Sequence, residues 1–189
     1  MVVGLALVGA RALAAANVAG QIPPDQRGQI DLVYVEHVEG SFKPAGPAIM
    51  NQRNLAYVPH LLPVLRGTPV RFRSDDQVLH NVFARGPDQR VLFNLAVLPH
   101  MQLEKTLDAL GATELTCSVH RAMLAFVFVL QNPYWAVPDE HGRWEIRGLP
   151  AGHYAVRVWG EALDDGARAK RYPIDVAAEG SQTLALPGR

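Results

Sequence analysis

Residues Thr113–Gln131 read T-E-L-T-C-S-V-H-R-A-M-L-A-F-V-F-V-L-Q, and this stretch decides the fold. It contains two short strand-like runs, Thr113–Cys117 and Ala125–Gln131, and the second is almost uninterrupted in its apolar character. Apolar runs of this length, rich in β-branched and aromatic residues, are typical of strands that are buried on both faces. We therefore expect two strands near the centre of a β-sandwich, joined by a tight loop.

The rest of the chain from residue 29 onward has the period-two alternation of strands. In Pro69–Arg73, for example, Val70 and Phe72 lie on one face of the expected strand and the two arginines lie on the other. The 16 glycines and 14 prolines place a turn roughly every ten residues, as in β-sandwiches. We expect an all-β fold with strands at 30–38, 55–58, 69–73, 78–83, 91–98, 103–107, 113–117, 125–131, 135–137, 144–146, 154–159, 172–176 and 183–186. Only Leu103–Leu110 is also compatible with a helical turn or two.

The composition excludes several classes of protein. Lys plus Arg and Asp plus Glu number 18 each, so the net charge is zero, and no basic block indicates a nucleic-acid surface. With 49% hydrophobic and 19% charged residues the chain is not disordered, and 189 residues suffice for one domain or two small ones. The sequence has no glycine-rich phosphate loop and neither a His-Glu-x-x-His nor a Gly-x-Ser-x-Gly motif, so we expect no enzyme activity.

The N-terminal segment Val2–Ala16 is almost wholly apolar. It is too short to span a bilayer but has the length of the apolar part of a secretory signal, and Ala14–Ala16 supply the small residues of a cleavage site. We therefore predict a signal peptide at residues 1–16, a mature N-terminus at Asn17, and a periplasmic or secreted protein without a membrane span. No basic residue precedes the run and Arg11 interrupts it, so a buried helix of a cytosolic domain is the alternative.

The chain's one cysteine belongs to a group of metal-binding residue types. Cys117, His120 and Met123 follow one another at intervals of three, and His80 lies upstream within V-L-H-N-V-F. One Cys, two His and one Met are the donor set of a mononuclear electron-transfer copper site, since thiolate and thioether favour Cu(I) while imidazole suits both oxidation states. Two alternatives remain: zinc, which a Cys/His₂ group holds tetrahedrally, and a cysteine that is merely a small core residue.

The remaining histidines do not pair at spacings that predict a second metal site. They lie at expected surface or turn positions: His37, His60, His100, His141 and His153. His60 and His100 each adjoin a proline, and both are candidates for the end of the molecule that carries Cys117.

Two motifs resemble the cupredoxin family. The segment C-S-V-H-R-A-M (117–123) has the C-x-x-H-x-x-M spacing of the amicyanin group, and V-L-H-N-V-F (78–83) is similar to the cupredoxin strand that supplies the first histidine. The resemblance implies one copper ion per chain, with Cys117 as the thiolate, His80 as the buried imidazole, His120 as the exposed one and Met123 as the axial thioether. It also implies that Asn81 ties the two ligand loops together by hydrogen bonds.

The wider chain is similar to plastocyanin-like proteins often labelled methylamine utilisation proteins, through M-N-Q-R-N-L-A-Y-V-P-H (50–60) and N-P-Y-W-A-V-P-D-E-H-G-R-W (132–144). Val119 and Arg121 stand where amicyanin-type loops carry proline. The resemblance implies one-electron transfer in the periplasm, with a c-type cytochrome or a periplasmic dehydrogenase as partner. Two alternatives stay open: a copper-delivery or copper-sequestering protein with the same ligands, and a scaffold or adhesion β-sandwich with a vestigial metal site.

The C-terminal part, residues 132–189, resembles the carboxypeptidase regulatory-like β-sandwich through D-E-H-G-R-W-E-I-R-G-L-P-A-G-H-Y (139–154). Gly142 fits a hairpin turn that needs a positive φ. We expect a cupredoxin domain at 29–131, a Greek-key sandwich, followed by this smaller unit. Because 132–189 is short for such a sandwich, the alternative is that Ile30–Val38 packs in the C-terminal unit and the copper domain is an insertion.

Overall fold

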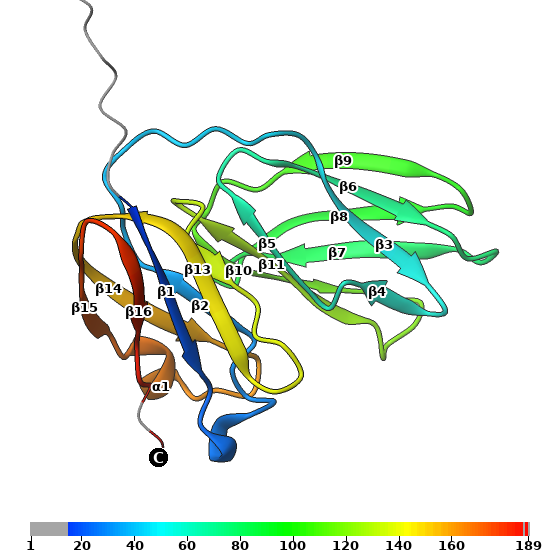
Figure 1. The fold of residues 1–189 in the computed structure, drawn as a ribbon. Coiled ribbons are helices and arrows are strands. Elements are labelled where there is room, and N and C mark those ends of the chain that lie inside the picture. Colours follow the sequence, from blue (N-terminus) through cyan, green and yellow to red (C-terminus); the bar gives the residue numbers. More distant parts are fainter. Residues whose placement is uncertain (1–14, 187, 189) are drawn as a thin grey trace, which may run out of the picture. The chain divides into compact units, whose positions relative to one another are not determined.

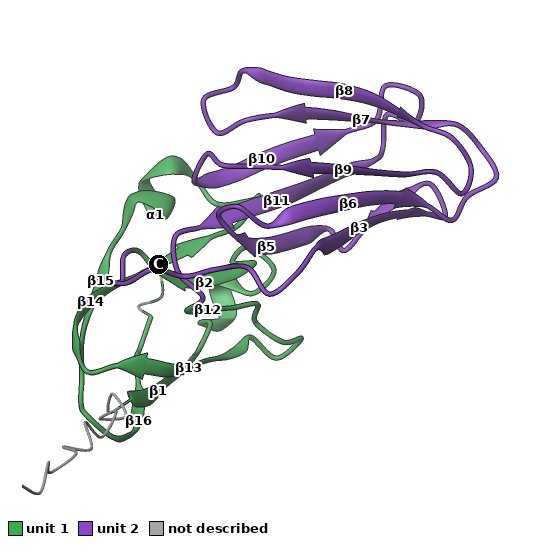
Figure 2. Ribbon diagram, turned by 90° about the horizontal axis from the view of Figure 1, so that it is seen from above, with its two compact units in different colours: residues 1–36, 134–189 green, residues 37–133 purple. Residues whose placement is uncertain are grey.

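The computed structural model describes residues 15–186 and residue 188, and these are almost entirely strands and the turns between them (Figure 1). The expectation of an all-β chain is confirmed. The chain divides into two compact units, which Figure 2 colours separately. Residues 37–133 form what we call the inserted unit, and residues 1–36 with 134–189 form the split unit. Within the described residues, no helix is both long and apolar enough to cross a membrane.

The inserted unit is built from two sheets. The first has the strand order β5 (Leu61–Leu65), β11 (Leu124–Leu130), β10 (Gly111–Thr116), β7 (His80–Arg85) and β8 (Val91–Val97). The second has the order β4 (Ala56–Val58), β3 (Ala48–Arg53), β6 (Pro69–Ser74) and β9 (Gln102–Thr106). The buried side chains of both sheets form one core cluster, so the two sheets pack as a sandwich.

β11 lies inside the first sheet, paired parallel with β5 and antiparallel with β10. Every residue of β11 from Ala125 to Leu130 is buried, which explains why this run is apolar without alternation. By contrast, β6 alternates: Val70 and Phe72 are fully buried, while Arg71 and Arg73 are partly exposed. The two strand patterns on which the expected fold depends are therefore confirmed.

A side-chain amide joins the two ends of the inserted unit. The Gln131 amide nitrogen donates to the Val38 carbonyl (3.0 Å), and its oxygen accepts from the Val38 N–H (3.1 Å). Asn132 donates to the same Gln131 oxygen (3.0 Å). The chain thus enters and leaves this unit at one place, and a glutamine side chain mimics one step of a β-ladder there.

The split unit also has two sheets. One has the order β13 (Arg143–Pro150), β1 (Ala15–Gln21) and β16 (Gly180–Thr183). The other has the order β12 (Trp135–Ala136), β2 (Leu32–Val35), β14 (Gly152–Trp159) and β15 (Tyr172–Val176). A single 3₁₀ turn (Pro24–Gln26) and the short helix α1 (Asp165–Ala169) complete the regular elements of the described chain. Gly142 has a φ of +76°, as its hairpin turn requires.

The expected domain boundary at residue 29 differs from the one in the structure. β2 lies between β12 and β14, so both of its edges pair with strands from the C-terminal part of the chain. The inserted unit therefore begins at His37 rather than at residue 29, and it ends at Pro133. This division corresponds to the alternative in which Ile30–Val38 packs with the C-terminal part of the chain and residues 37–133 are an insertion.

One alternative is excluded, and some elements were not expected. Leu103–Leu110 forms no helical turn, because the strand expected at 103–107 is present as β9, in which Leu103 pairs with Phe72 at the edge of the second sheet. The sequence gives no expectation of β3 or β5, which flank the expected strand 55–58. Helix α1 is also unexpected; it begins after Asp164, whose carboxylate accepts a hydrogen bond from the Ala167 N–H (2.7 Å).

The predicted signal peptide lies mostly outside the described residues, because only its last two residues fall within them. Ala15 and Ala16 form the start of β1. Ala16 is buried and pairs with Leu149 on one side and Gly180 on the other. The junction expected after Ala16 therefore falls inside a strand that is paired along both edges.

Candidate metal centre

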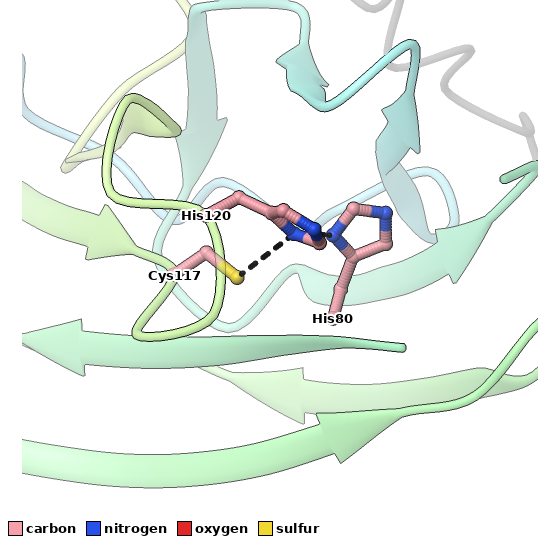
Figure 3. A group of neighbouring side chains, drawn as sticks. All are labelled: His80, Cys117 and His120. Carbon is pink, nitrogen blue, oxygen red and sulfur yellow. Dashed lines mark hydrogen bonds between the residues drawn. The ribbon is translucent and has the colours of Figure 1, made fainter. Parts of the chain in front are cut away.

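Three of the four predicted ligands converge in the inserted unit (Figure 3). The Nδ1 atoms of His80 and His120 are 3.1 Å apart, and the Cys117 Sγ is 3.9 Å from the His120 Nδ1. The ligand atoms of the three residues all lie within 4.8 Å of one another. In the described part of the chain, no other group of three His, Cys, Asp or Glu side chains is this close.

Strand register explains why residues so far apart in the sequence meet. β7 and β10 are antiparallel neighbours, and their last ladder pair joins Thr116 to Phe83. Cys117 follows this pair directly, so it lies at the end of the sheet where His80 begins β7. The loop then turns back tightly, with the Met123 N–H donating to the His120 carbonyl (3.0 Å), and β11 starts at the next residue.

The ring of His80 has a fixed orientation. Its Nε2 lies 2.9 Å from the Asp76 carboxylate, and its Nδ1 faces His120. A carboxylate that accepts from one ring nitrogen of a histidine selects the tautomer and leaves the other nitrogen's lone pair for a metal. Nδ1 is therefore the ligating atom that this geometry offers.

Asp76 has further donors around it. Its two carboxylate oxygens accept from the backbone N–H groups of Asn54 (2.7 Å) and Leu55 (3.0 Å). Burial tends to raise the pKa of the Asp76 carboxyl, but the N–H groups of Leu55 and Asn54 and the His80 ring together outweigh this, so the pKa lies below its usual value. The carboxylate that orients His80 is thus ionised at neutral pH.

Asn81 joins the two ligand segments, as the resemblance implies. Its backbone N–H donates to the Cys117 Sγ (3.5 Å), and its side-chain oxygen accepts from the Ser118 N–H (2.7 Å) and hydroxyl (3.0 Å). Its side-chain nitrogen donates to the Asn94 amide oxygen on β8 (2.6 Å). Two ligand segments and a neighbouring strand are therefore joined through one buried asparagine.

Burial differs among the predicted ligands. His80 and Cys117 are buried, with 0% and 3% of their surfaces exposed, whereas His120 is partly exposed. Met123 is buried in the same core cluster as Cys117. Its place at the end of the ligand loop agrees with a fourth ligand, and its role as the axial thioether stays a prediction.

The three converging atoms suit a metal ion by their chemistry, and two of their three separations also suit one; the third, between the Cys117 sulfur and the His80 ring nitrogen, is within 4.8 Å. Usual bond lengths in such sites are about 2.0 Å for imidazole nitrogen and about 2.3 Å for thiolate sulfur. Two nitrogens 3.1 Å apart can both make such bonds to one ion, at an angle of about 100°. The 3.9 Å separation of Sγ and Nδ1 corresponds to an angle of about 130°. A soft thiolate with two imidazoles at these angles suits copper, and it also accommodates zinc.

The other histidines lie outside this group. Two of them contact segments next to the ligands: the His60 ring contacts the Leu124 carbonyl (3.1 Å), and the His100 ring accepts from the Gln77 amide (3.1 Å). The remaining three pair with exposed carboxylates on the surface, namely His37 with Glu39, His141 with Glu140 and His153 with Asp175.

Sequence reasoning missed two residues of the site. Asp76 lies between the expected strands 69–73 and 78–83 and was given no role, although its position four residues before His80 is a signal that a carboxylate can reach the ring. Tyr57 was expected only to belong to a strand. Its buried hydroxyl lies 2.8 Å from the Asn81 carbonyl and 3.0 Å from the Thr116 carbonyl, and no local motif indicates this.

Comparisons with known proteins give cupredoxins among the solved structures. No family model matches the chain, and no curated protein matches it. A purple cupredoxin from Nitrosopumilus maritimus is 25% identical with a TM-score of 0.40, and the match covers 43% of this chain and 98% of that one. Amicyanin from Paracoccus versutus is 16% identical with a TM-score of 0.41, covering 51% and 96%. An oxidised amicyanin mutant, in which glycine replaces a proline, is 20% identical with a TM-score of 0.41, covering 45% and 83%.

Proposed function

We propose that this chain is a periplasmic electron-transfer protein that binds one copper ion in a type 1 centre. The proposed ligands are His80, Cys117, His120 and Met123. The observation that carries the proposal is the convergence of two imidazole Nδ1 atoms and one cysteine sulfur at the end of a β-sandwich. These donors come from two strand ends and one tight loop, a frame that need not rearrange when an electron arrives.

When bound, copper supplies the exchange of one electron between Cu(II) and Cu(I). The residues of this chain hold the ligands for that exchange. Asp76 orients His80, and the Asn81 N–H donates to the Cys117 sulfur. His120 is the partly exposed ligand, so we propose it as the route by which electrons enter and leave.

The proposed partners are a c-type cytochrome or a periplasmic dehydrogenase. The resemblance of the ligand loop to the amicyanin group supports them, and the exposed Val119 next to His120 offers an apolar contact. Export is proposed from the apolar segment that precedes β1. Because Ala16 is buried within β1, we expect the mature N-terminus at or before Ala15 rather than at Asn17. Mass spectrometry of the secreted protein tests this, and an N-terminus beyond Ala16 would contradict it.

Copper delivery or sequestration is the second candidate, because the partial exposure of His120 also gives an incoming ligand access to a metal. Competition with a copper chelator distinguishes the two functions. A reversible redox couple with slow copper loss supports electron transfer. Rapid loss to the chelator supports delivery.

The proposal is tested by titrating the full chain with Cu(II) beside the Cys117→Ser variant. We expect an intense thiolate-to-copper absorption band that saturates at one copper per chain and is absent from the variant. Copper binding without such a band, or a band that survives the substitution, would overturn the proposal. Zinc added before copper serves as a control for occupancy of the same ligands.

A further inference from the structure

Tyr57 contacts the backbone on both sides of the metal centre. Its hydroxyl lies 2.8 Å from the carbonyl of Asn81, the residue after His80, and 3.0 Å from the carbonyl of Thr116, the residue before Cys117. The side chain is 4% exposed and belongs to the core cluster. One phenol therefore touches both segments that carry the buried ligands.

The position of this hydroxyl in the fold gives the contact its importance. Tyr57 comes from β4 in the second sheet, whereas both carbonyls belong to strands of the first sheet. The β7–β10 ladder ends at the pair Thr116–Phe83. From there the ligand segments are joined by side chains: by the Asn81 amide to Ser118 and by the Tyr57 hydroxyl.

The hydroxyl keeps its proton under ordinary conditions. Burial is the main cause that raises the pKa of Tyr57, and the electrostatic effect of Cys117 adds to it, while the Gln52 side chain acts in the opposite direction. The phenol is therefore always a hydrogen-bond donor. Since it has one proton for two carbonyls, it is shared between the segments rather than committed to one.

We infer that Tyr57 is a positioning residue of the metal centre, whose hydroxyl holds the His80 and Cys117 segments at the spacing that their ligand atoms need. The inference rests on the proposed function for its effect on copper. Residues that orient metal ligands typically change metal affinity by about 10- to 100-fold when they are removed. Loss of the hydroxyl also allows the Cys117 segment to open more easily in the metal-free protein.

The experiment compares Tyr57→Phe with Thr113→Val in the full chain. Thr113 is the matched control because its hydroxyl is also buried in this unit, on β10, and no hydrogen-bond partner of that hydroxyl is seen. Each substitution removes one buried hydroxyl, but only Tyr57→Phe removes a hydroxyl that hydrogen-bonds to the segments carrying His80 and Cys117. In the metal-free protein we would measure the reaction rate of the Cys117 thiol with an aromatic disulfide reagent. With copper we would measure the dissociation rate, the energy of the thiolate band and the reduction potential.

We expect Tyr57→Phe to speed thiol reaction and copper loss at least tenfold and to shift the band and the potential. Thr113→Val should leave all four readouts close to those of the unchanged chain. Site-specific 3-fluorotyrosine at position 57, which keeps the donor, should restore them and would show that misfolding is not the cause. Equal behaviour of the two substitutions, in the metal-free protein and with copper, would overturn the inference.

Failure of the proposed function is a separate result. If the unchanged chain gives no thiolate band with copper, the proposed function fails, and the thiol reaction rate still decides the role of Tyr57. If the unchanged chain gives the band and Tyr57→Phe is identical to it in every readout, the proposed function stands and the inference fails.

Discussion

Each unit of the molecule contains a cluster of polar side chains that joins distant segments of the chain, and these two clusters differ in kind. In the split unit, the Glu36 carboxylate accepts hydrogen bonds from Arg157 (3.0 Å) and from Arg171 (2.6 and 2.7 Å). Opposite charges attract each other there. In the inserted unit, His80, His120 and Cys117 bring three lone-pair donors together.

The difference separates a structural cluster from a functional one. The ion pairs of Glu36, which follows β2, with Arg157 and Arg171 stabilise the sheet without any bound ligand. Converging lone pairs repel one another and are desolvated, so they stabilise nothing without a cation or a shared proton. Departures of this kind from the rules of stable packing are expected at functional sites. The tryptophans make the two units separately observable, because Trp135, Trp144 and Trp159 all lie in the split unit.

The largest expected effects come from the two cores. Leu115 and Leu149 are both fully buried, in the inserted and split units respectively. Truncation of either to alanine should lower the free energy of unfolding of its own unit by about 3–5 kcal/mol. Denaturant titrations followed by tryptophan fluorescence and by the copper band would report the two units. We expect Leu115→Ala to weaken the band and Leu149→Ala to leave it intact, and the reverse pattern would contradict the assignment of the centre to the inserted unit.

Copper binding should stabilise the inserted unit more than the split unit. At a free copper concentration a hundred times the dissociation constant, the inserted unit should gain about 2.7 kcal/mol in free energy of unfolding. The transition followed by tryptophan fluorescence should move less. The same titration of Cys117→Ser is the control, and an equal shift of both transitions would mean that the units do not respond separately to metal.

Asn81→Ala is expected to have an intermediate effect. The substitution removes the acceptor of the Ser118 N–H and hydroxyl and the donor to Asn94, and it should cost the metal-free inserted unit about 2 kcal/mol. Asn17 in β1 is the matched asparagine of the split unit, with bonds to Glu145 and the Gly148 N–H at an exposed position. Thermal unfolding should show a smaller loss for Asn17→Ala and no change in copper affinity.

Glu36→Gln is expected to have the smallest effect, because its arginine partners are partly exposed and screened. Hydrogen bonding from Arg171 lowers the pKa of Glu36, against the opposing effect of burial and with further help from Arg157. A folded-state pKa below the unfolded value gives stability that is present at neutral pH and lost as pH falls below about 5. The free energy of unfolding of the split unit, followed by tryptophan fluorescence, should therefore fall more between pH 6 and pH 3 in the unchanged chain than in the variant. Equal pH dependence of this free energy in both proteins would refute the ion pair's contribution.

The sequence predicts those parts of the structure that depend on local spacing. The interval of three between Cys117 and His120 and the position of His80 within an expected strand are visible in the chain, and the structure brings these three residues together. The roles of Asp76 and Tyr57 are not visible in this way, since they depend on which loop and which sheet face the ligands. β1 is missed for a related reason: an Ala- and Val-rich segment near the start of a chain predicts a signal, whereas its pairing is decided by β13 and β16, far along the chain.

The Gln131–Val38 contact has a consequence for the order in which the molecule comes apart. While the inserted unit is folded, its two ends are held together by the Gln131–Val38 contact, so β2 and β12 are in effect connected by a short link. When this unit unfolds, β2 and β12 are connected by a flexible chain of about a hundred residues. Closing so long a chain costs roughly 2–3 kcal/mol more in chain entropy than closing a few residues. Unfolding of the inserted unit therefore destabilises the split unit. A ligand that stabilises the inserted unit also stabilises, without touching it, the sheet that contains β2.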